Sequence, residues 1–423
     1  MTADGVAADG VASAPPPHTR LARALTALSE NTYLSATRAG MVAVVPLTII
    51  GGLFLIVAFL PVSGWEARVA PFLPVLQIPV TATFGMLAVF ACLAIAYDLG
   101  RQLKQEPIVS ASIALVVFLM LQIEPMDSGL RMEGLGSRGL FTAILIALVT
   151  VRVQKFFTDR RLVVALPPSV PPIVYQSFLS LSPLFFLLTC FWLLRFVAGV
   201  DIDRLIQAAF SPLVFALNTL PGILVYALLV AGLWSIGING DNAVDAIVAP
   251  IFLQYLAANV EAMTGGQPLP YVTAYGFFTT FVNVGGTGAT IALALLLCRS
   301  REPGYRKISR LSLPTQVFQI NEPIFFGLPI VLNPIFMIPY VLNALILTTG
   351  SYLLMQAGAI HKPFVNVPWT TPPVIGHYLV SGGDWRAAVW GVVSIVIAMA
   401  VYFPFARTAE RQRLRAVPEP LPR

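Results

Sequence analysis

The sequence predicts an all-α protein that crosses a membrane about ten times and carries two re-entrant hairpins. Of its 423 residues, 57% are hydrophobic and only 11% are charged, whereas a soluble protein carries about 25% charged residues. The mean hydropathy is +0.80, and apolar runs of about 17–25 residues, long enough to cross a bilayer as helices, recur along the chain. Between Arg310 and Lys362 a single residue, Glu322, carries a formal charge. These features together indicate a polytopic membrane protein.

The apolar runs give the order of the membrane elements. Plain spanning helices are expected at residues 41–60, 76–97, 107–123, 139–153, 179–200, 222–238, 276–298, 332–358 and 386–405. Residues 239–260 and 315–331 are apolar but interrupted, which favours re-entrant hairpins, because irregular backbone is tolerated at membrane depth only where protein or a cavity satisfies it. Prolines at 323, 329, 334 and 339 cannot all lie within one straight helix.

The basic residues predict the orientation of the chain. Most of its 26 Lys and Arg lie before the first span, after the second and fourth spans, in the loop 299–310 and in the C-terminal tail. All these places fall on one side if the N-terminus is cytoplasmic, as the positive-inside rule requires, and the C-terminus is then cytoplasmic too. The first 20 residues lack the apolar core of a cleaved signal peptide. We expect them to be a disordered leader, followed by an amphipathic stretch at 21–34 on the cytoplasmic surface.

The strongest candidate for a ligand site is the segment Asn321-Glu322-Pro323-Ile324. A lone carboxylate at membrane depth costs at least about 2.5 kcal/mol, so such a residue usually faces a cavity and has a function. A carboxylate accepts two hydroxyl donors at once, and an amide both donates and accepts, so Glu322 and Asn321 suit the hydroxyls of a sugar. The structural alternative is an acid that pairs with backbone N–H groups at a hairpin tip. A broken, apolar segment with one acid is typical of a transport site, and we favour that interpretation.

Two further segments carry a tryptophan beside polar residues. Trp234 precedes the turn Gly237-Ile238-Asn239-Gly240, where Asn239 can bond a hydroxyl and Gly240 lets the backbone approach a ligand. Trp369 lies between Pro368 and two threonines, and an aromatic face can stack on a sugar ring. Each segment has a structural alternative of equal weight. The first also suits a turn at the membrane surface, and the second an interfacial tryptophan.

A glycine-rich segment, residues 284–290, also has two interpretations. It can unwind a helix and offer backbone groups to a ligand, or it can form a small-residue face for close helix packing. We favour packing.

The charge pattern divides the chain into two unequal halves. Residues 205–298 contain no Lys or Arg, so weakly charged and irregular membrane segments concentrate in the second half. We expect a leader at 1–20, an N-terminal interface and scaffold domain at 21–178, a C-terminal transport domain with the re-entrant hairpins at 179–405, and a cytoplasmic tail at 406–423.

Several other functions find no support in the sequence. Cys92, Cys190 and Cys298 lie far apart without metal or disulfide spacing, so no metal site and no cofactor is expected. The net charge of +6 comes from basic residues beside apolar segments, which indicates membrane topology rather than nucleic-acid binding. A membrane enzyme with Glu322 as general acid would need a second catalytic group, and the candidates are few: Asp241, Asp245 and Glu261. We therefore expect no self-contained catalytic centre.

Taken together, these segments resemble the lactose/cellobiose (diacetylchitobiose) family of IIC permeases of the bacterial phosphotransferase system (PTS). The resemblance extends from about residue 28 to 405 and rests on residues 31–40 with Pro46 and Gly51, 166–178, 234–240, 285–290, 321–339 and 368–386. The Asn-Glu-Pro-Ile segment with its following prolines is its most specific feature.

The resemblance implies a permease of the bacterial inner membrane that binds a β-linked disaccharide of the cellobiose and chitobiose class. It also implies an elevator-type movement of the site, a homodimer formed through the N-terminal domain, and a separate IIB protein that phosphorylates the sugar. Matched to the family's motifs, Glu322 would be the sugar-binding acid with Asn321 beside it. The expected substrate site comprises Glu322, Asn321, Asn239, Gly240, Trp369 and Trp234.

One position departs from the family pattern. Where the family usually has Gly-Ile-His-Gly, this chain has Gly237-Ile238-Asn239-Gly240. Asparagine can form hydrogen bonds, but it cannot take up a proton near neutral pH as histidine can. This departure motivates an alternative function on the same fold, a non-phosphorylating facilitator or a proton-coupled sugar carrier.

Overall fold

The computed structural model describes residues 31–59, 64–124, 129–162, 178–328 and 330–416. The expected leader, the first ten residues of the amphipathic stretch and the last residues of the tail lie outside these ranges. The helices of the first half are α2 Thr32–Ala58, α3 Trp65–Val69, η1 Ala70–Phe72, α4 Leu73–Thr83, η2 Phe84–Met86, α5 Leu87–Gln102, α6 Pro107–Leu121, α7 Met132–Leu135, η3 Ser137–Gly139 and α8 Leu140–Asp159. Those of the second half are α10 Leu181–Trp192, η4 Leu193–Val197, α11 Ile202–Leu217, α12 Leu220–Ser235, α13 Gly240–Thr264, η5 Phe277–Val282, η6 Thr287–Ala289, α14 Thr290–Leu297, α15 Pro303–Val317, α16 Glu322–Gly327, α17 Pro334–Gln356, α18 Pro373–Val380 and α19 Trp385–Ala416.

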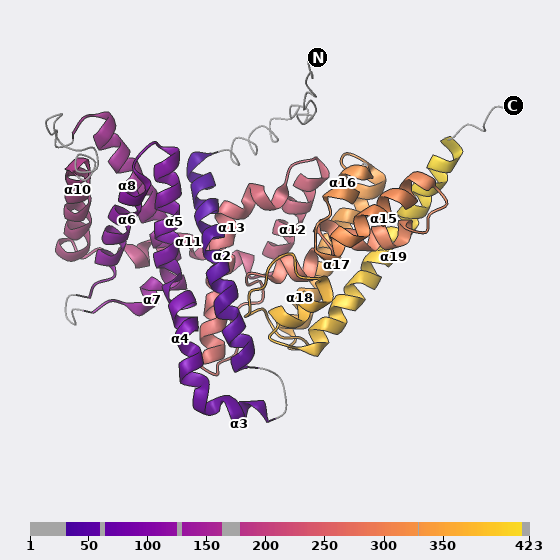
Figure 1. The fold of residues 1–423 in the computed structure, drawn as a ribbon, viewed down its shortest axis with the longest axis horizontal. Helices are drawn as coiled ribbons and strands as arrows, with labels where there is room; N and C mark the ends of the chain where they lie inside the picture. The colour runs from indigo at the N-terminus through magenta and orange to yellow at the C-terminus, as the bar shows by residue number, and fades with distance from the viewer. Residues whose placement is uncertain (1–30, 60–63, 125–128, 163–177, 329, 417–423) are drawn as a thin grey trace, which may run out of the picture.

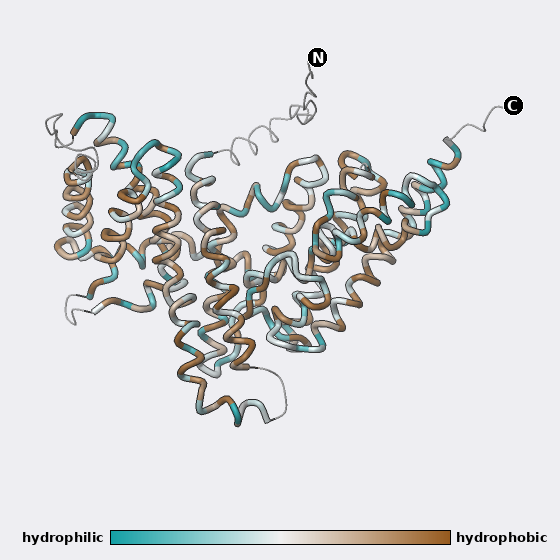
Figure 2. The backbone as a smooth tube through the Cα atoms, viewed as in Figure 1, coloured by the Kyte–Doolittle hydropathy of each residue, from teal (hydrophilic) through white to brown (hydrophobic). Residues whose placement is uncertain are grey.

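The described residues form an all-helical protein, which confirms the predicted fold class. Seven of the described helices are long and apolar enough to cross a membrane. An eighth crossing is available if the bent pair Leu181–Val197 and Ile202–Leu217 counts as one span, and α6 and α12 are shorter apolar helices. The predicted ten crossings are therefore reached only when the bent pair and both short helices are counted. Figure 2 shows hydrophobic residues along the helix bodies and hydrophilic residues gathered near the upper ends.

The helices are arranged in two groups (Figure 1). In the first group α5 packs against α2, α6 and α8, and Gly40 of α2 lies directly against the backbone of Ile95 in α5. In the second group α19 packs against α14, α17 and α18, and α12 packs against α17. The buried apolar side chains of both groups belong to one hydrophobic cluster.

The two groups meet along α2. Helix α13 packs against α2. Gly52 of α2 lies against the backbone of Asn366, and the Asn366 amide donates a hydrogen bond of 2.7 Å to the hydroxyl of Thr48. Asn366 is 1% exposed, so this polar link is sealed between the two groups.

The loop that carries Asn366 is anchored to the start of α19 by Asp384. Its carboxylate accepts hydrogen bonds from the backbone N–H of His361 (2.9 Å) and from the Arg386 side chain (2.9 and 3.1 Å). Burial alone would raise the pKa of Asp384, but these hydrogen bonds outweigh it and hold the pKa below its usual value. Asp384 therefore stays ionised and fixes the loop.

The first predicted re-entrant hairpin, at 239–260, is wrong. The structure has a continuous helix of 25 residues there, α13, which begins where the Asn239 side chain accepts a hydrogen bond from the Asn242 backbone (2.9 Å). Its residues are largely buried by neighbouring protein, and Pro250 lies within it. A helix surrounded by protein tolerates the polar residues and the proline that we took for an interruption.

The break lies instead in the segment predicted as a plain span at 276–298. Helix η5 ends at Val282, and α14 begins only at Thr290. Between them Gly285, Gly286 and Gly288 have φ values of 71°, 103° and 67°, which side chains with a Cβ rarely adopt. The segment is unwound, and Gly288 also packs face-on against the ring of Tyr340. Both features proposed for the glycines, unwinding and close packing, are therefore present.

Gln319 provides a hydrogen-bond acceptor for the backbone of this broken segment. Its side-chain oxygen accepts hydrogen bonds from the backbone N–H groups of Gly285 (2.7 Å) and Gly286 (3.0 Å). The backbone oxygen of Gly288 accepts a hydrogen bond of 2.8 Å from the hydroxyl of Tyr402. The unwound backbone is thus satisfied by buried side chains.

The second predicted interruption, at 315–331, is confirmed as a break. Helix α15 ends at Val317, and α16 begins at Glu322. Gln319, in the turn between the two helices, has a φ of 66°, in the left-handed region. After α16 the backbone N–H of Leu332 bonds the oxygen of Ser235 (2.9 Å), which fixes this region against the end of α12.

We predict that Gly288→Ala destabilises the protein by about 2 kcal/mol or more. The new Cβ would overlap the ring of Tyr340, and alanine is strained at this φ. Thermal unfolding in detergent measures the effect. Gly232→Ala is the matched control, because Gly232 lies within α12 with no atom near its would-be Cβ. Equal melting temperatures for the two variants would contradict the prediction.

We also predict that Gln319→Leu costs about 1–3 kcal/mol of stability, since it leaves the buried Gly285 N–H without an acceptor and the Gly286 N–H with only the Asn283 backbone oxygen. Gln316→Leu is the control. Gln316 is fully buried, and neither of its side-chain polar atoms has a partner among the described residues, so the change should be neutral or stabilising. The pair is compared by the same thermal unfolding, and a larger loss for the Gln316 variant would refute the assignment.

Candidate functional site

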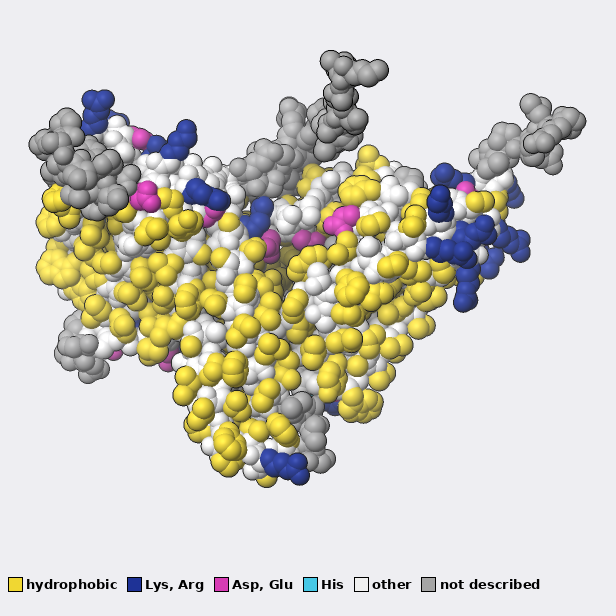
Figure 3. All heavy atoms as spheres, in the orientation of Figure 1, with side chains coloured by type: hydrophobic (Ala, Val, Ile, Leu, Met, Phe, Trp, Pro, Cys, Tyr) yellow, Lys and Arg dark blue, Asp and Glu magenta, His cyan; other side chains and the backbone are white. Residues whose placement is uncertain are grey.

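A cavity of about 360 Å³ lies where α12, α13 and α16 meet the broken segment. Five of the six residues predicted from the sequence line it: Trp234, Asn239, Asn321, Glu322 and Trp369. Gly240 does not, because its Cα is packed against the backbone of Val230. Figure 3 shows a hollow near the middle of the molecule with acidic side chains at its rim.

Glu322 is the first residue of α16, directly before Pro323. Its side chain is exposed in the cavity and forms no hydrogen bond or ion pair with any of the described residues. The structural alternative, an acid that pairs with backbone N–H groups at a hairpin tip, is therefore not observed. The carboxylate is free to accept hydrogen bonds from a ligand.

Asn321 joins the two broken segments. Its side-chain N–H₂ donates to the backbone oxygen and hydroxyl of Thr287 (3.0 and 2.9 Å) and to the hydroxyl of Thr290 (3.1 Å). Only 5% of the residue is exposed. Its Oδ1 has no partner among the described residues and is not sealed from the cavity. Asn321 thus presents one acceptor to the cavity from a fixed position.

Trp234 and Asn239 are held by bonds within the site. The indole N–H of Trp234 donates to the carboxylate of Asp241 (2.8 Å), and its ring packs edge-on against Phe325. The Asn239 oxygen caps α13. Asn239 is therefore both a turn residue and a cavity residue, which unites the two interpretations left open by the sequence.

Trp369 lies at the rim of the cavity. It is 60% exposed, and the turn that carries it is closed by a hydrogen bond from the Thr371 N–H to the Pro368 oxygen (2.9 Å). Its large apolar face is therefore available to a ring-shaped ligand.

Two of the three acidic residues that line the cavity were not predicted from the sequence as site residues. Asp241 and Asp245 both line it, one helical turn apart on α13. They were considered only as possible catalytic groups. Had 240–264 been predicted as a helix, the spacing of four residues would have placed both acids on one face.

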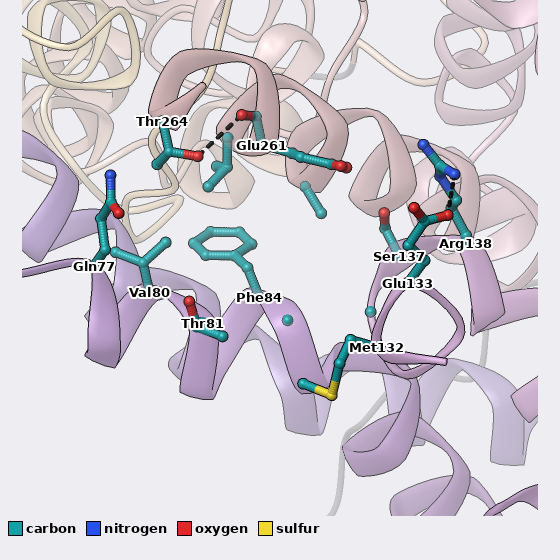
Figure 4. A pocket seen from close by; sticks show the side chains of 14 residues that line it. Gln77, Val80, Thr81, Phe84, Met132, Glu133, Ser137, Arg138, Glu261 and Thr264 are labelled. Carbon is teal, nitrogen blue, oxygen red and sulfur yellow. Dashed lines mark hydrogen bonds and ion pairs between the residues drawn. The ribbon is translucent and has the colours of Figure 1, made fainter. Parts of the chain in front are cut away.

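Glu261, the third acid considered, belongs elsewhere. It lies twenty residues after Asp241 on α13, about 30 Å along the helix axis. It lines a second cavity, of about 270 Å³, between α4, α7, η3 and the end of α13. Figure 4 shows the Glu261 side chain pointing into that cavity, near the ion pair of Glu133 with Arg138. Glu261 is therefore remote from Glu322.

No metal chemistry is apparent in the described part of the chain. It contains no group of three His, Cys, Asp or Glu side chains placed to hold a metal ion. The three cysteines are unpaired.

Comparison with known proteins places the chain in a family. Residues 38–344 match the family model described as "Phosphotransferase system, EIIC". The chain is 34% identical to the "PTS system cellobiose-specific EIIC component" of Geobacillus stearothermophilus, over 91% of this chain and 92% of that protein. It is 28% identical to the "PTS system lactose-specific EIICB component" of Lacticaseibacillus casei, over 90% of this chain and 68% of that longer protein.

A solved structure agrees with the sequence comparisons. The crystal structure of the transporter ChbC, the IIC component of the N,N'-diacetylchitobiose-specific phosphotransferase system, superposes with a TM-score of 0.87 at 31% identity. The match covers 93% of this chain and 97% of that one. These findings confirm the resemblance inferred from the sequence, and the chain belongs to the EIIC family, the membrane-spanning sugar permeases of the phosphotransferase system.

Proposed function

We propose that the chain binds a β-linked disaccharide in the cavity around Glu322 and carries it across the bacterial inner membrane. The observation that carries this proposal is the unpaired Glu322 carboxylate, beside the Oδ1 of Asn321, in a cavity rimmed by the exposed face of Trp369. Acceptors next to an aromatic face suit a sugar, whose hydroxyls donate and whose ring face is apolar. Relatives named for cellobiose, lactose and diacetylchitobiose support the disaccharide class.

Transport would follow an elevator-type movement of one helix group against the other. The second group carries the cavity, and it contacts the first group where α13 packs against α2 and where α10 and α11 pack against α6 and α8. We assign the first group, residues 21–178, to the scaffold and homodimer interface, and the second, residues 179–405, to transport. The contact between the groups includes the buried link from Asn366 to Thr48, and Asp203 of α11 accepts hydrogen bonds from Gln122 and Arg131 of the first group, so the movement would have to preserve or exchange these bonds.

The basic edge of the molecule supports cytoplasmic termini. Helix α2 begins and α19 ends at the same edge in Figure 1, and Figure 3 shows most visible Lys and Arg side chains along it. The positive-inside rule places such an edge in the cytoplasm.

Phosphorylation by a separate IIB protein would then trap the sugar inside the cell. The longer EIICB relatives join an EIIC part and a B part in one chain, which supports a IIB partner. The departure at Asn239 favours the alternative, transport without phosphorylation, because no histidine lines the cavity among the described residues.

We predict that Glu322→Gln weakens cellobiose binding at least about tenfold, since a charged acceptor contributes about 1.5–3 kcal/mol. Isothermal titration of the purified protein measures the affinity. Glu261→Gln, the same change on α13 but in the second cavity, should bind as the parent does. Undiminished affinity in the Glu322 variant would count against the assigned site.

Uptake in vesicles separates the two transport modes. With radiolabelled cellobiose, we expect accumulation of sugar phosphate only when phosphoenolpyruvate, the soluble phosphocarriers and IIB are present. Asn239→His should raise the yield of sugar phosphate if a titratable side chain assists the transfer. Accumulation of unmodified sugar without any phosphate donor would instead establish the facilitator or carrier.

A further inference from the structure

We infer that the cavity prefers a β-1,4-linked disaccharide of glucosamine with free, protonated amines over the neutral disaccharide of the same skeleton. This inference rests on the proposed function, because it names the charge of the substrate for the same site.

The cavity wall is negatively charged. Three carboxylates line it, Asp241 and Asp245 from α13 and Glu322 from α16, and no Lys, Arg or His lines it among the described residues. The Asp241 carboxyl group accepts a hydrogen bond from the Trp234 N–H, a neutral donor. The charged groups that act on Asp245 are Asp241 and Arg38 of α2, and Arg38 does not line the cavity.

The remaining polar wall contains amide and hydroxyl groups, among them one fixed acceptor. The Oδ1 of Asn321 faces the cavity without a partner among the described residues, although the side chain is almost fully buried. The N–H groups of Gly285 and Gly286, which could have donated to a ligand, are already taken by Gln319. Three carboxyl groups and this carbonyl oxygen therefore give the cavity several acceptors for the hydrogen-bond donors of a ligand.

An ammonium group meets these demands better than a hydroxyl. It supplies three donors and a positive charge, and it acquires attraction to aromatic faces such as Tyr226, Tyr275 and Trp369 in the same cavity. With an effective dielectric constant of about 20, one ammonium about 5 Å from one carboxylate gains several times RT, part of which desolvation removes. We therefore expect the amino disaccharide to bind about tenfold more tightly than its hydroxyl counterpart, a difference of about 1.4 kcal/mol.

The test compares two ligands by isothermal titration of the purified full-length protein at about pH 6, where an aliphatic amine is protonated. The ligands are cellobiose and the β-1,4-linked glucosamine disaccharide, which share one skeleton and differ in the substituent at the second carbon. The parent should bind the amino sugar about tenfold more tightly. N,N'-diacetylchitobiose, in which the amines are acylated and neutral, should not show this gain.

Variants test which acidic residues cause the preference for the amino sugar. Asp245→Asn should bring the two affinities within about threefold, because it weakens binding of the amino sugar more than binding of cellobiose, and measurable cellobiose binding also shows that the variant is folded. Asp241→Asn is the second variant, for use if the first does not fold. Glu261→Gln is the matched control, because it removes an acid from the same helix outside this cavity, and it should keep the full preference.

The outcomes separate the inference from the function on which it rests. Equal affinity of the parent for the two sugars overturns the inference and leaves the disaccharide permease standing. A preference unchanged in the Asp245 and Asp241 variants overturns the assignment to these acids. If neither sugar binds, the proposed disaccharide substrate fails, and the charge preference fails with it.

Discussion

The structure depends on finding hydrogen-bond partners for backbone N–H and C=O groups that are buried within a hydrophobic protein. Two segments break their helices where helical hydrogen bonds are lost, at 283–289 and at 318–321. An unpaired buried N–H costs about 1–3 kcal/mol, so such breaks persist only when side chains replace the lost partners. Gln319 and Asn321 do this: both come from the break at 318–321, and both bond backbone groups of the break at 283–289. These bonds hold the two non-helical segments in place, and residues of both segments line the cavity.

The hydrogen bonds of Asn321 also fix the position of the free carboxylate of Glu322. Glu322 follows Asn321 directly, so the clamp on Asn321 fixes the backbone from which the acid projects. The acid itself forms no bond with any described residue, and its hydrogen-bonding capacity remains available. Rigid support beside an unsatisfied group is the arrangement expected of a preorganised binding site.

The sequence predicted the fold class and five of the cavity residues from local signals. Glu322 was found because one charge in a long apolar stretch is rare, and Trp369 because tryptophan beside proline and threonine suits a rim. The position of the break could not be found in the same way. Proline and two acids made 239–260 seem interrupted, whereas burial by neighbouring helices allowed α13 to continue. The glycines at 285, 286 and 288 were weighed as packing residues, because their positive φ values depend on Gln319 and Tyr402, which follow 30 or more residues later. Gly240 was assigned to the site from its turn, but only tertiary packing reveals that it lies against Val230.

Helix α13 lines the two cavities described above, with Asp241 and Asp245 at one end and Glu261 at the other. An unbroken helix transmits displacement along its axis with little compression. A shift of α13 relative to α2 and α4 therefore alters the two hollows together, although they are separated by most of the thickness of a bilayer. Because linkage between sites is reciprocal, a molecule lodged beside Glu261 and one lodged beside Asp245 must each change the affinity of the other whenever that shift occurs.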